Sequence, residues 1–370
     1  MKAAIVSTFD TFFDRVNLLK EFYQEKGYEV CTITSDFSHR LKEKYINEQA
    51  DVQIPIKEYQ KNLSLNRLRS HFLFAKDVKK YLETFKTDLI NCIIPCNSLC
   101  QAMSEYKKLN SCRLIFDLND LWPESLPVGK IKNVFPFTLW RNKRDLYIND
   151  ADLVLTECHY FQEILEKTKD PKWHTLFYSK KDLPIESSFQ WKEDSLHFCY
   201  LGSVNNIIDI DIIEKFLEKC AQQKPTFLHL VGGGEKKSVL IQSLQRKSVL
   251  VIDHGYIFDQ NEKQKIFDEC RYGLNVMKST VIVGLTMKSL DYMCGGLPII
   301  NTIQGDTADF CRTRGIGYNI DSNTVQDIVD TILMETEEEN RKEREAIKNL
   351  YLTTFTQEVF NHELERLGLS

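Results

Sequence analysis

The stretch that decides the fold is VGLTMKSLDYMCGGLPII, residues 283–300. Gly284 permits an unusual backbone turn, and Thr286 is a residue type that caps a helix beginning directly after it. Gly295–Gly296 is a typical helix end, and Pro298 opens a short apolar strand. A turn, a short helix and a buried strand in this order are typical of a parallel α/β sheet.

The same alternation of β-rich apolar runs and helical stretches extends outward from there over the whole chain. The first half predicts strands at Ala3–Ser7, Glu29–Thr34, Asp88–Ile94, Arg113–Asp117 and Leu153–Thr156, with a helix at Asp14–Glu25. The second half predicts strands at Leu196–Leu201, Thr226–Val231, Ser248–Ile252, Gly273–Met277 and Pro298–Asn301, and helices at Ile208–Cys220, Glu235–Leu244 and Glu262–Cys270. The predicted fold class is therefore α/β, with two Rossmann-like domains facing a central cleft.

Length and composition agree with two soluble domains. The chain has 370 residues, 42% hydrophobic and 27% charged, enough for two separate cores. The predicted parts are an N-terminal domain (1–182), a polar linker (183–195), a C-terminal domain (196–350) and a C-terminal helix (351–370) that packs back on the N-terminal domain. The start lacks the pattern of a signal peptide, and the eleven cysteines are scattered, which predicts free thiols in the cytoplasm.

Two glycine turns in the second half point to an anionic ligand. Gly202 and Ser203 follow the first strand of that half, and glycine there lets the backbone approach a ligand closely. Gly232 and Gly233 lie in a turn between a strand and a helix, where free N–H groups and the helix dipole attract an anion. The alternative is an ordinary tight turn between a strand and a helix, which needs the same glycines and binds no anion.

The helix after Thr286 gives the strongest indication of that ligand. Its first-turn amides, including the amide of Met287, would face the same anion as Lys288, which suits a diphosphate. Asp291 lies three residues further along the same face, where it can accept hydrogen bonds from two ribose hydroxyls. The alternative is a surface Lys–Asp pair on an ordinary helix.

These residues resemble the signature of GT-B glycosyltransferases, specifically the family-4-like group. In that group a helix of the form S-K-x-x-E/D-Y-M-x-x-G-x-P-V-I holds the diphosphate of the sugar donor. The segment 116–125, FDLNDLWPES, resembles the D-x-W-P-E-S element of bacterial surface-polysaccharide members, and Ala151–Thr156 resembles the strand that follows it. The resemblance implies a UDP- or GDP-linked sugar donor, a retaining reaction, and backbone contacts from Tyr256 and Ile257 to the nucleotide base.

Three positions depart from the family pattern. Val283 stands where members often have glutamate, and Ser203–Asn206 lacks their Arg and Lys. The glycine-rich loop after the first strand is replaced by Ser7–Phe12. The departures keep two alternatives open, a non-catalytic partner of an active glycosyltransferase and a GT-B sugar-nucleotide epimerase.

The sequence predicts neither a metal ion nor an organic cofactor. Asp209 and Asp211 form a D-x-D element, but they fall at a predicted helix start, where acidic residues suit the helix dipole. The even spacing of Cys92, Cys96 and Cys100 matches no metal or cluster pattern. The charge balance gives no indication of nucleic-acid binding.

The first half is the more basic one and is expected to bind the acceptor, a glycan or a polyprenyl-linked glycan. Asp120, at the carboxyl end of a strand, and then Asp10 are the candidates to contact the sugar or the acceptor hydroxyl; each can equally be a loop acid or a cap. Residues 128–144 mix aromatic and basic side chains, which predicts either peripheral contact with the inner face of the membrane or a core helix with a solvated face.

Overall fold

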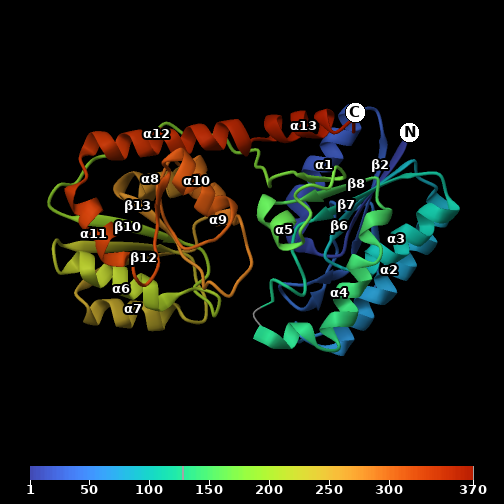
Figure 1. Cartoon of the computed structure of the whole chain (residues 1–370), viewed down its shortest axis with the longest axis horizontal. Helices are drawn as coiled ribbons and strands as arrows, with labels where there is room; N and C mark the ends of the chain where they lie inside the picture. Colours follow the sequence, from blue (N-terminus) through green and yellow to red (C-terminus); the bar gives the residue numbers. More distant parts are fainter. Residues whose placement is uncertain (127–128, 370) are drawn as a thin grey trace. The chain divides into compact units, whose positions relative to one another are not determined.

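The computed structural model describes residues 1–126 and 129–369, which fold as two compact units (Figure 1). The first unit consists of Met1–Tyr178 and Phe360–Ser370, and the second of Ser179–Val359. The boundary falls just before the predicted linker at 183–195. Within the described ranges, no helix combines the length and the apolar character needed to cross a bilayer.

A seven-stranded parallel sheet forms the centre of the first unit, in the order β5-β2-β1-β6-β7-β8-β9. Its strands are β1 (Lys2–Ser7), β2 (Glu29–Ser35), β5 (Val52–Ile54), β6 (Leu89–Ile94), β7 (Arg113–Leu118), β8 (Leu153–Thr156) and β9 (Trp173–Thr175). Its helices are α1 (Phe13–Glu25), α2 (Leu65–Phe85), α3 (Ser98–Leu109), α4 (Phe137–Asp145) and α5 (His159–Ile164), with a small antiparallel pair, β3 (Phe37–Ser38) and β4 (Glu43–Lys44). All six residues of β6 are buried, as expected for a strand covered on both faces.

The end of the chain contributes to the core of this first unit. Helix α13 (Gln357–Arg366) brings Phe360 and Leu364 against the apolar side chains of β1 and α1, and Leu369 joins them. This C-terminal segment was predicted to begin at residue 351, but residues 351–354 are the end of α12 (Glu337–Thr354), which belongs to the second unit.

The second unit has a six-stranded parallel sheet in the order β12-β11-β10-β13-β14-β15. Its strands are β10 (Leu196–Leu201), β11 (Thr226–Val231), β12 (Val249–Gly255), β13 (Tyr272–Asn275), β14 (Ile299–Asn301) and β15 (Gly317–Asn319). Its helices, besides α12, are α6 (Ile210–Ala221), α7 (Lys237–Arg246), α8 (Gln260–Glu269), α9 (Met287–Cys294), α10 (Asp306–Arg314) and α11 (Val325–Met334). The prediction of two Rossmann-like domains is thus confirmed.

Candidate functional site

Helix α9 begins directly beyond the carboxyl end of β13, in the stretch that the sequence singled out. Thr286 caps it, because its hydroxyl oxygen accepts a hydrogen bond from the Ser289 amide at 3.2 Å. The Ser289 hydroxyl in turn donates to the side-chain oxygen of Asn275, the last residue of β13, at 3.2 Å. These bonds fix the first turn of α9 at the edge of the sheet where parallel strands end, the usual ligand edge of such folds.

Lys288 places a positive charge in this first turn. Its ammonium donates to the carbonyl of Val276 at 3.3 Å and lies 4.9 Å from the centre of the Tyr200 ring. Among the described residues no carboxylate comes within ion-pairing distance of it. Burial lowers the pKa of Lys288 to about 7. A partly desolvated cation at a helix N-terminus is suited to receive an anion.

The turn at Gly284 differs from the sequence expectation. The described glycines with a left-handed φ include Gly202, Gly232 and Gly255, but not Gly284. Instead, the carbonyl of Gly284 accepts hydrogen bonds from both the amide and the hydroxyl of Thr307, at 2.9 and 2.6 Å. The loop before α9 is therefore fixed by the start of α10 rather than by an unusual backbone conformation.

Asp291 faces different partners from Lys288. Its Oδ1 atom accepts from Lys180 at 2.7 Å and from Lys263 at 3.0 Å. The carboxylate is only about one-fifth exposed and is already neutralised by these two lysines. A ribose would therefore have to bind a carboxylate shared with Lys180 and Lys263, two residues that the sequence analysis did not find because they lie 111 and 28 residues away.

The glycine turns pack closely against one another. The Gly202 amide donates to the carbonyl of Val231, and the Gly232 amide donates to the carbonyl of Gly255. A Cβ atom on Gly232 would overlap the carbonyl of Gly202, and one on Gly233 would overlap the hydroxyl of Tyr256. Glycine is needed here for close packing of three loops at the sheet edge, whether or not an anion binds there.

Ser203, Met287 and Tyr256 are exposed, and Ile257 is half-buried. The Tyr256 ring stacks on Phe258 at 6.3 Å, and Tyr256 is 67% exposed. These side chains surround the loops after β10, β12 and β13, so the predicted donor residues of the second unit lie at one edge of its sheet.

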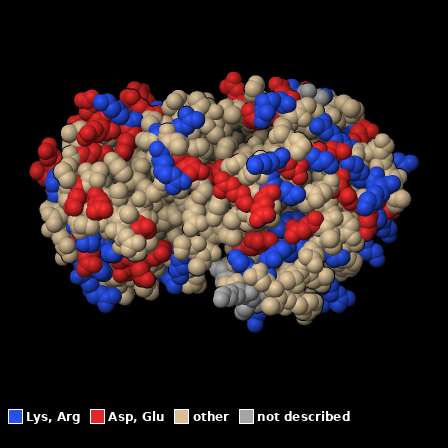
Figure 2. All heavy atoms as spheres, viewed as in Figure 1, with Lys and Arg blue, Asp and Glu red and all other residues tan. Residues whose placement is uncertain are grey.

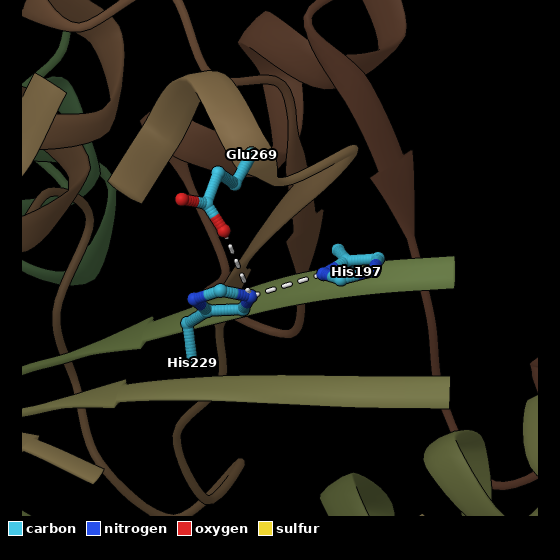
Figure 3. A group of neighbouring side chains, drawn as sticks. All are labelled: His197, His229 and Glu269. Carbon is cyan, nitrogen blue, oxygen red and sulfur yellow. Dashed lines mark hydrogen bonds and ion pairs between the residues drawn. The ribbon is translucent and has the colours of Figure 1, made fainter. Parts of the chain in front are cut away.

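Two histidines, His197 and His229, and Glu269 form a separate group in the second unit (Figure 3). His197 Nδ1 lies 3.0 Å from His229 Nε2, and Glu269 Oε2 lies 3.9 Å from the same His229 atom (Figure 3). Burial lowers the pKa of His197 to about 4 and of His229 to about 3, so both rings are neutral at pH 7. His229 Nδ1 continues the chain to His254 at 3.1 Å. The ammonium of Lys192, 3.7 Å from Glu269, opposes a cation at this place.

Asp120 follows β7 in the first unit. Its Oδ1 atom accepts from the Leu121 amide at 2.8 Å and from the Ser125 hydroxyl at 2.5 Å. Burial raises the pKa of the carboxyl group, while Ser125 and the positive charge of Arg67 act in the opposite direction. Asp120 is thus a half-buried acid at a strand's carboxyl end.

Asp10 has both carboxylate oxygens occupied. Oδ2 accepts from the Ser38 hydroxyl at 2.6 Å, and Oδ1 accepts from the His39 amide at 3.1 Å. These bonds tie the loop after β1 to the β3–β4 pair, which is a positioning role.

In the segment 128–144, which was predicted either to contact the membrane or to be a core helix, some of the basic residues form contacts within the protein. Residue 128 lies outside the described residues, and Arg144 is fully buried with two hydrogen bonds to Glu124, at 2.9 and 2.8 Å. Arg141 also pairs with Glu124, at 2.9 Å. Two of the basic residues expected to contact a membrane therefore hold the D-x-W-P-E-S element in place. The exposed large apolar residues of the segment are Val134, Phe135 and Leu139, and the polar residues Asn133 and Asn142 are exposed as well.

The chain has a GT-B fold of two Rossmann-like units, and in the second unit a capped helix at the strand ends carries a lysine for which the described residues offer no carboxylate partner. The sequence matches no protein-family model, and no curated protein matches it. Solved structures of this fold match the full chain at low identity. They include HepE from Anabaena in complex with UDP (TM-score 0.73, 14% identity, 100% of both chains), sucrose-phosphate synthase from Thermosynechococcus elongatus (0.69, 14%, 100% of this chain and 98% of that one) and the apo form of the lipopolysaccharide outer core galactosyltransferase WaaB (0.67, 15%, 100% of both).

Proposed function

We propose that the protein is a glycosyltransferase that moves a sugar from a UDP- or GDP-linked donor to a glycan or polyprenyl-linked acceptor. The reaction would proceed with retention, without a metal ion or organic cofactor, in the cytoplasm or at the inner face of the membrane. The observation that carries this proposal is the Lys288 ammonium, without a carboxylate partner among the described residues, in the capped first turn of α9.

In the proposed reaction the bond between the anomeric carbon and the diphosphate breaks, and its electron pair goes to the phosphate oxygen. Lys288 and the first-turn amides of α9 stabilise this growing negative charge. The acceptor hydroxyl oxygen bonds to the same carbon while its proton passes to the departing phosphate oxygen, and Asp120 is the candidate to contact that hydroxyl or the sugar. Two further solved structures of similar fold are HepE complexes with UDP-glucose and with UDP and glucose, which supports a nucleotide-sugar donor.

Melting temperatures with UDP, GDP and ADP, each with and without a linked glucose, test the donor. A ligand at 100 times its Kd stabilises the folded state by about 2.7 kcal/mol, so the correct nucleotide raises the melting temperature and the others do not. No shift with any of the nucleotides would contradict the proposal.

A non-catalytic partner of an active glycosyltransferase is the second candidate. Val283 and the lysine-paired carboxylate of Asp291 favour it, because both reduce the polar groups free to hold a donor. Slow hydrolysis of the stabilising nucleotide sugar by the isolated chain excludes this candidate. Binding without any hydrolysis or transfer supports it.

A further inference from the structure

Arg67, at the start of α2, is a buried cation that forms no ion pair with any of the described residues. Its side chain is 1% exposed. Nη1 donates to the carbonyl of Asn62 at 2.8 Å, whereas Nε and Nη2 have no hydrogen-bond partner at normal distance in the described part of the chain. Burial lowers the pKa of Arg67 to about 10, so the guanidinium still carries its charge at pH 7. A buried charge with unsatisfied donors is costly unless an anion completes it.

Aromatic rings surround this guanidinium, whereas a buried arginine is ordinarily paired with a carboxylate. The rings belong to Trp122 at 4.0 Å, Phe9 at 5.6 Å, and Tyr59 and Trp140 at 5.8 Å. Cation–π contacts hold the charge in place but leave its N–H groups unused. Asp120 favours the charge electrostatically without reaching ion-pairing distance. Besides the Nη1 bond to Asn62, the Tyr59 hydroxyl interacts with the guanidinium, but Nε and Nη2 form no hydrogen bond of normal geometry in the described residues and can serve the oxygens of a ligand.

Arg67 also lines a pocket of about 390 Å³ in the first unit. Of the described residues around this pocket, Arg67 is the charged one, and most of the wall is apolar: Leu63, Leu65, Leu68, Phe135, Phe137 and Trp140. Pockets of this size hold small molecules. The combination of one cation with hydrophobic walls suits an amphiphile rather than a free sugar or a free ion.

The mouth of the pocket is hydrophobic and exposed. Leu63 is 50% exposed, Leu65 70% and Phe135 75%, and two further apolar residues of the segment before and within α4, Val134 and Leu139, are more than half exposed. Figure 2 shows uncharged side chains over the residues that lead into α4. Exposed apolar residues gathered at one place mark a binding surface for a protein, a ligand or a membrane. Here they continue the apolar wall of the pocket outward.

We propose that this pocket binds one lipid phosphate, with its phosphate head at Arg67 and its hydrocarbon chain running out past Leu65 and Phe135. The proposal rests on the proposed function and deepens it, because the bound lipid would be the carrier of the acceptor. Arg67, in the wall of the pocket, interacts electrostatically with Asp120, the candidate to contact the acceptor hydroxyl. The phosphate accepts hydrogen bonds from the guanidinium and neutralises its charge. The hydrocarbon chain of the lipid covers the exposed apolar residues.

Farnesyl phosphate, a short isoprenyl monophosphate, is the probe, used below its aggregation concentration and followed by tryptophan fluorescence. Trp122 and Trp140 both lie within 6 Å of Arg67 and report on the pocket. We expect saturable binding to the full-length chain. Farnesol, which lacks the charge, and inorganic phosphate, which lacks the chain, are each expected to bind at least about tenfold more weakly. Equal binding of farnesol and farnesyl phosphate would overturn the role of Arg67.

Two substitutions separate the head from the chain. Arg67→Met keeps an apolar side chain of similar length and removes the charge. We expect its affinity for farnesyl phosphate to fall about tenfold or more, to the level of farnesol, without a loss of melting temperature. Arg69→Met, on the same helix but exposed, is the matched control and leaves binding unchanged. Leu65→Ser removes part of the exposed mouth and is expected to weaken farnesol and farnesyl phosphate alike, whereas Leu109→Ser, at an equally exposed leucine outside the pocket, does not.

The outcomes distinguish this inference from the proposed function. UDP and GDP, titrated separately into the same samples, report on the second unit. Binding of either nucleotide with no binding of farnesyl phosphate overturns the lipid site alone, whereas binding of farnesyl phosphate with no binding of either nucleotide overturns the proposed function and leaves a lipid-phosphate site. The protein is also tested for binding to vesicles of phosphatidylglycerol. If farnesyl phosphate does not compete with this binding and Arg67→Met does not weaken it, the protein contacts the bilayer surface, and the proposal of a lipid-phosphate site in the pocket is overturned.

Discussion

Two arginines of the first unit are equally buried and have opposite surroundings. Arg15, in α1, is 0% exposed and forms two hydrogen bonds to Asp117 at the end of β7, at 2.7 and 2.8 Å. It also donates to the carbonyls of Leu176 and Phe177, at 3.0 and 3.2 Å. Arg67 is 1% exposed and has one carbonyl and four aromatic rings around it.

The difference indicates which buried charges hold the fold and which can serve binding. Arg15 joins a helix, a strand end and the segment after β9, and its N–H groups are used within the protein. Arg67 in the first unit and Lys288 in the second have no carboxylate partner among the described residues, and each stands at a loop edge beside a candidate ligand site. An unpaired desolvated charge lowers stability, so ligand binding explains the presence of Arg67 and Lys288 better than a contribution to the fold does.

Breaking the Arg15–Asp117 pair is expected to give the largest effect. Asp117→Asn leaves Arg15 buried without its counter-charge and should lower the free energy of unfolding by about 3–5 kcal/mol. Arg67→Met should change it little or raise it. Urea unfolding of the intact chain, followed by tryptophan fluorescence, measures both, because three of the four tryptophans lie in the first unit.

Asp309→Asn is the control for this comparison. Its pair with Arg312 is exposed, and its loss should cost no more than about 1 kcal/mol. Should Arg67→Met destabilise the protein as strongly as Asp117→Asn, Arg67 would be a structural residue and the contrast between the two arginines would disappear.

Removing the charge of Lys288 is expected to weaken nucleotide binding. Lys288→Ala loses one charge-assisted contact to the diphosphate, and the affinity for UDP or GDP should fall about 10- to 100-fold. The melting temperature without ligand should not fall, because the ammonium has no ion-pair partner in the described structure. Calorimetric titration measures the affinity, and Lys342→Ala, at an exposed lysine of α12, is the control. Unchanged affinity in Lys288→Ala would remove α9 from the donor site.

The pH dependence of binding tests the same side chain without a substitution. Burial lowers the pKa of Lys288 to about 7, so in the free protein the ammonium loses its proton as the pH rises through 7. The diphosphate binds the charged form, and its affinity should therefore decrease above pH 7, by up to tenfold per pH unit, and level off below pH 7 until the terminal phosphate of UDP takes up its own proton at about pH 6. Uridine, which lacks the phosphates, should show no such dependence. Nor should Lys288→Ala.

The lowered pKa of Lys288 also makes the free energy of unfolding depend on pH. An unfolded lysine keeps its ordinary pKa of 10.5, so between about pH 7 and 10.5 the unfolded chain binds more protons at this position than the folded chain. The contribution of Lys288 to the free energy of unfolding therefore rises with pH across this window.

The fold was largely predictable because parallel strands buried on both faces are continuous apolar runs. The predicted ranges Leu153–Thr156, Leu196–Leu201 and Thr226–Val231 coincide with β8, β10 and β11. The edge strands β5, β9 and β15 were missed, since three residues are too few to show a period; β14 is equally short and was predicted only because the Gly295–Pro298 motif precedes it. The predicted start of the C-terminal helix, residue 351, lies within α12, because α12 and α13 have the same helical pattern. The sequence does not show that α12 packs in the second unit and α13 in the first.

The candidate site was predictable only where neighbours in sequence are neighbours in space. Thr286 and Lys288 lie within one helical turn, and the cap of α9 follows from that local spacing. The partners of Asp291 come from Lys180 and Lys263, and the surroundings of Arg67 come from four separate segments. No periodicity or motif joins such residues, so they become visible only when the sheet brings them together.

Asp291 gives the smallest expected effect and the finest test of the donor site. If its carboxylate binds ribose while shared with Lys180 and Lys263, Asp291→Asn should weaken UDP binding by no more than about tenfold, the value of one or two net hydrogen bonds. The comparison ligand is 2′,3′-dideoxy-UDP, which lacks both hydroxyls and should bind Asp291→Asn and the unaltered protein equally. An equal loss for both ligands would instead mean that Asp291 acts by holding Lys180 and Lys263 in place, because the freed lysines rather than the missing ribose contact would then account for the change.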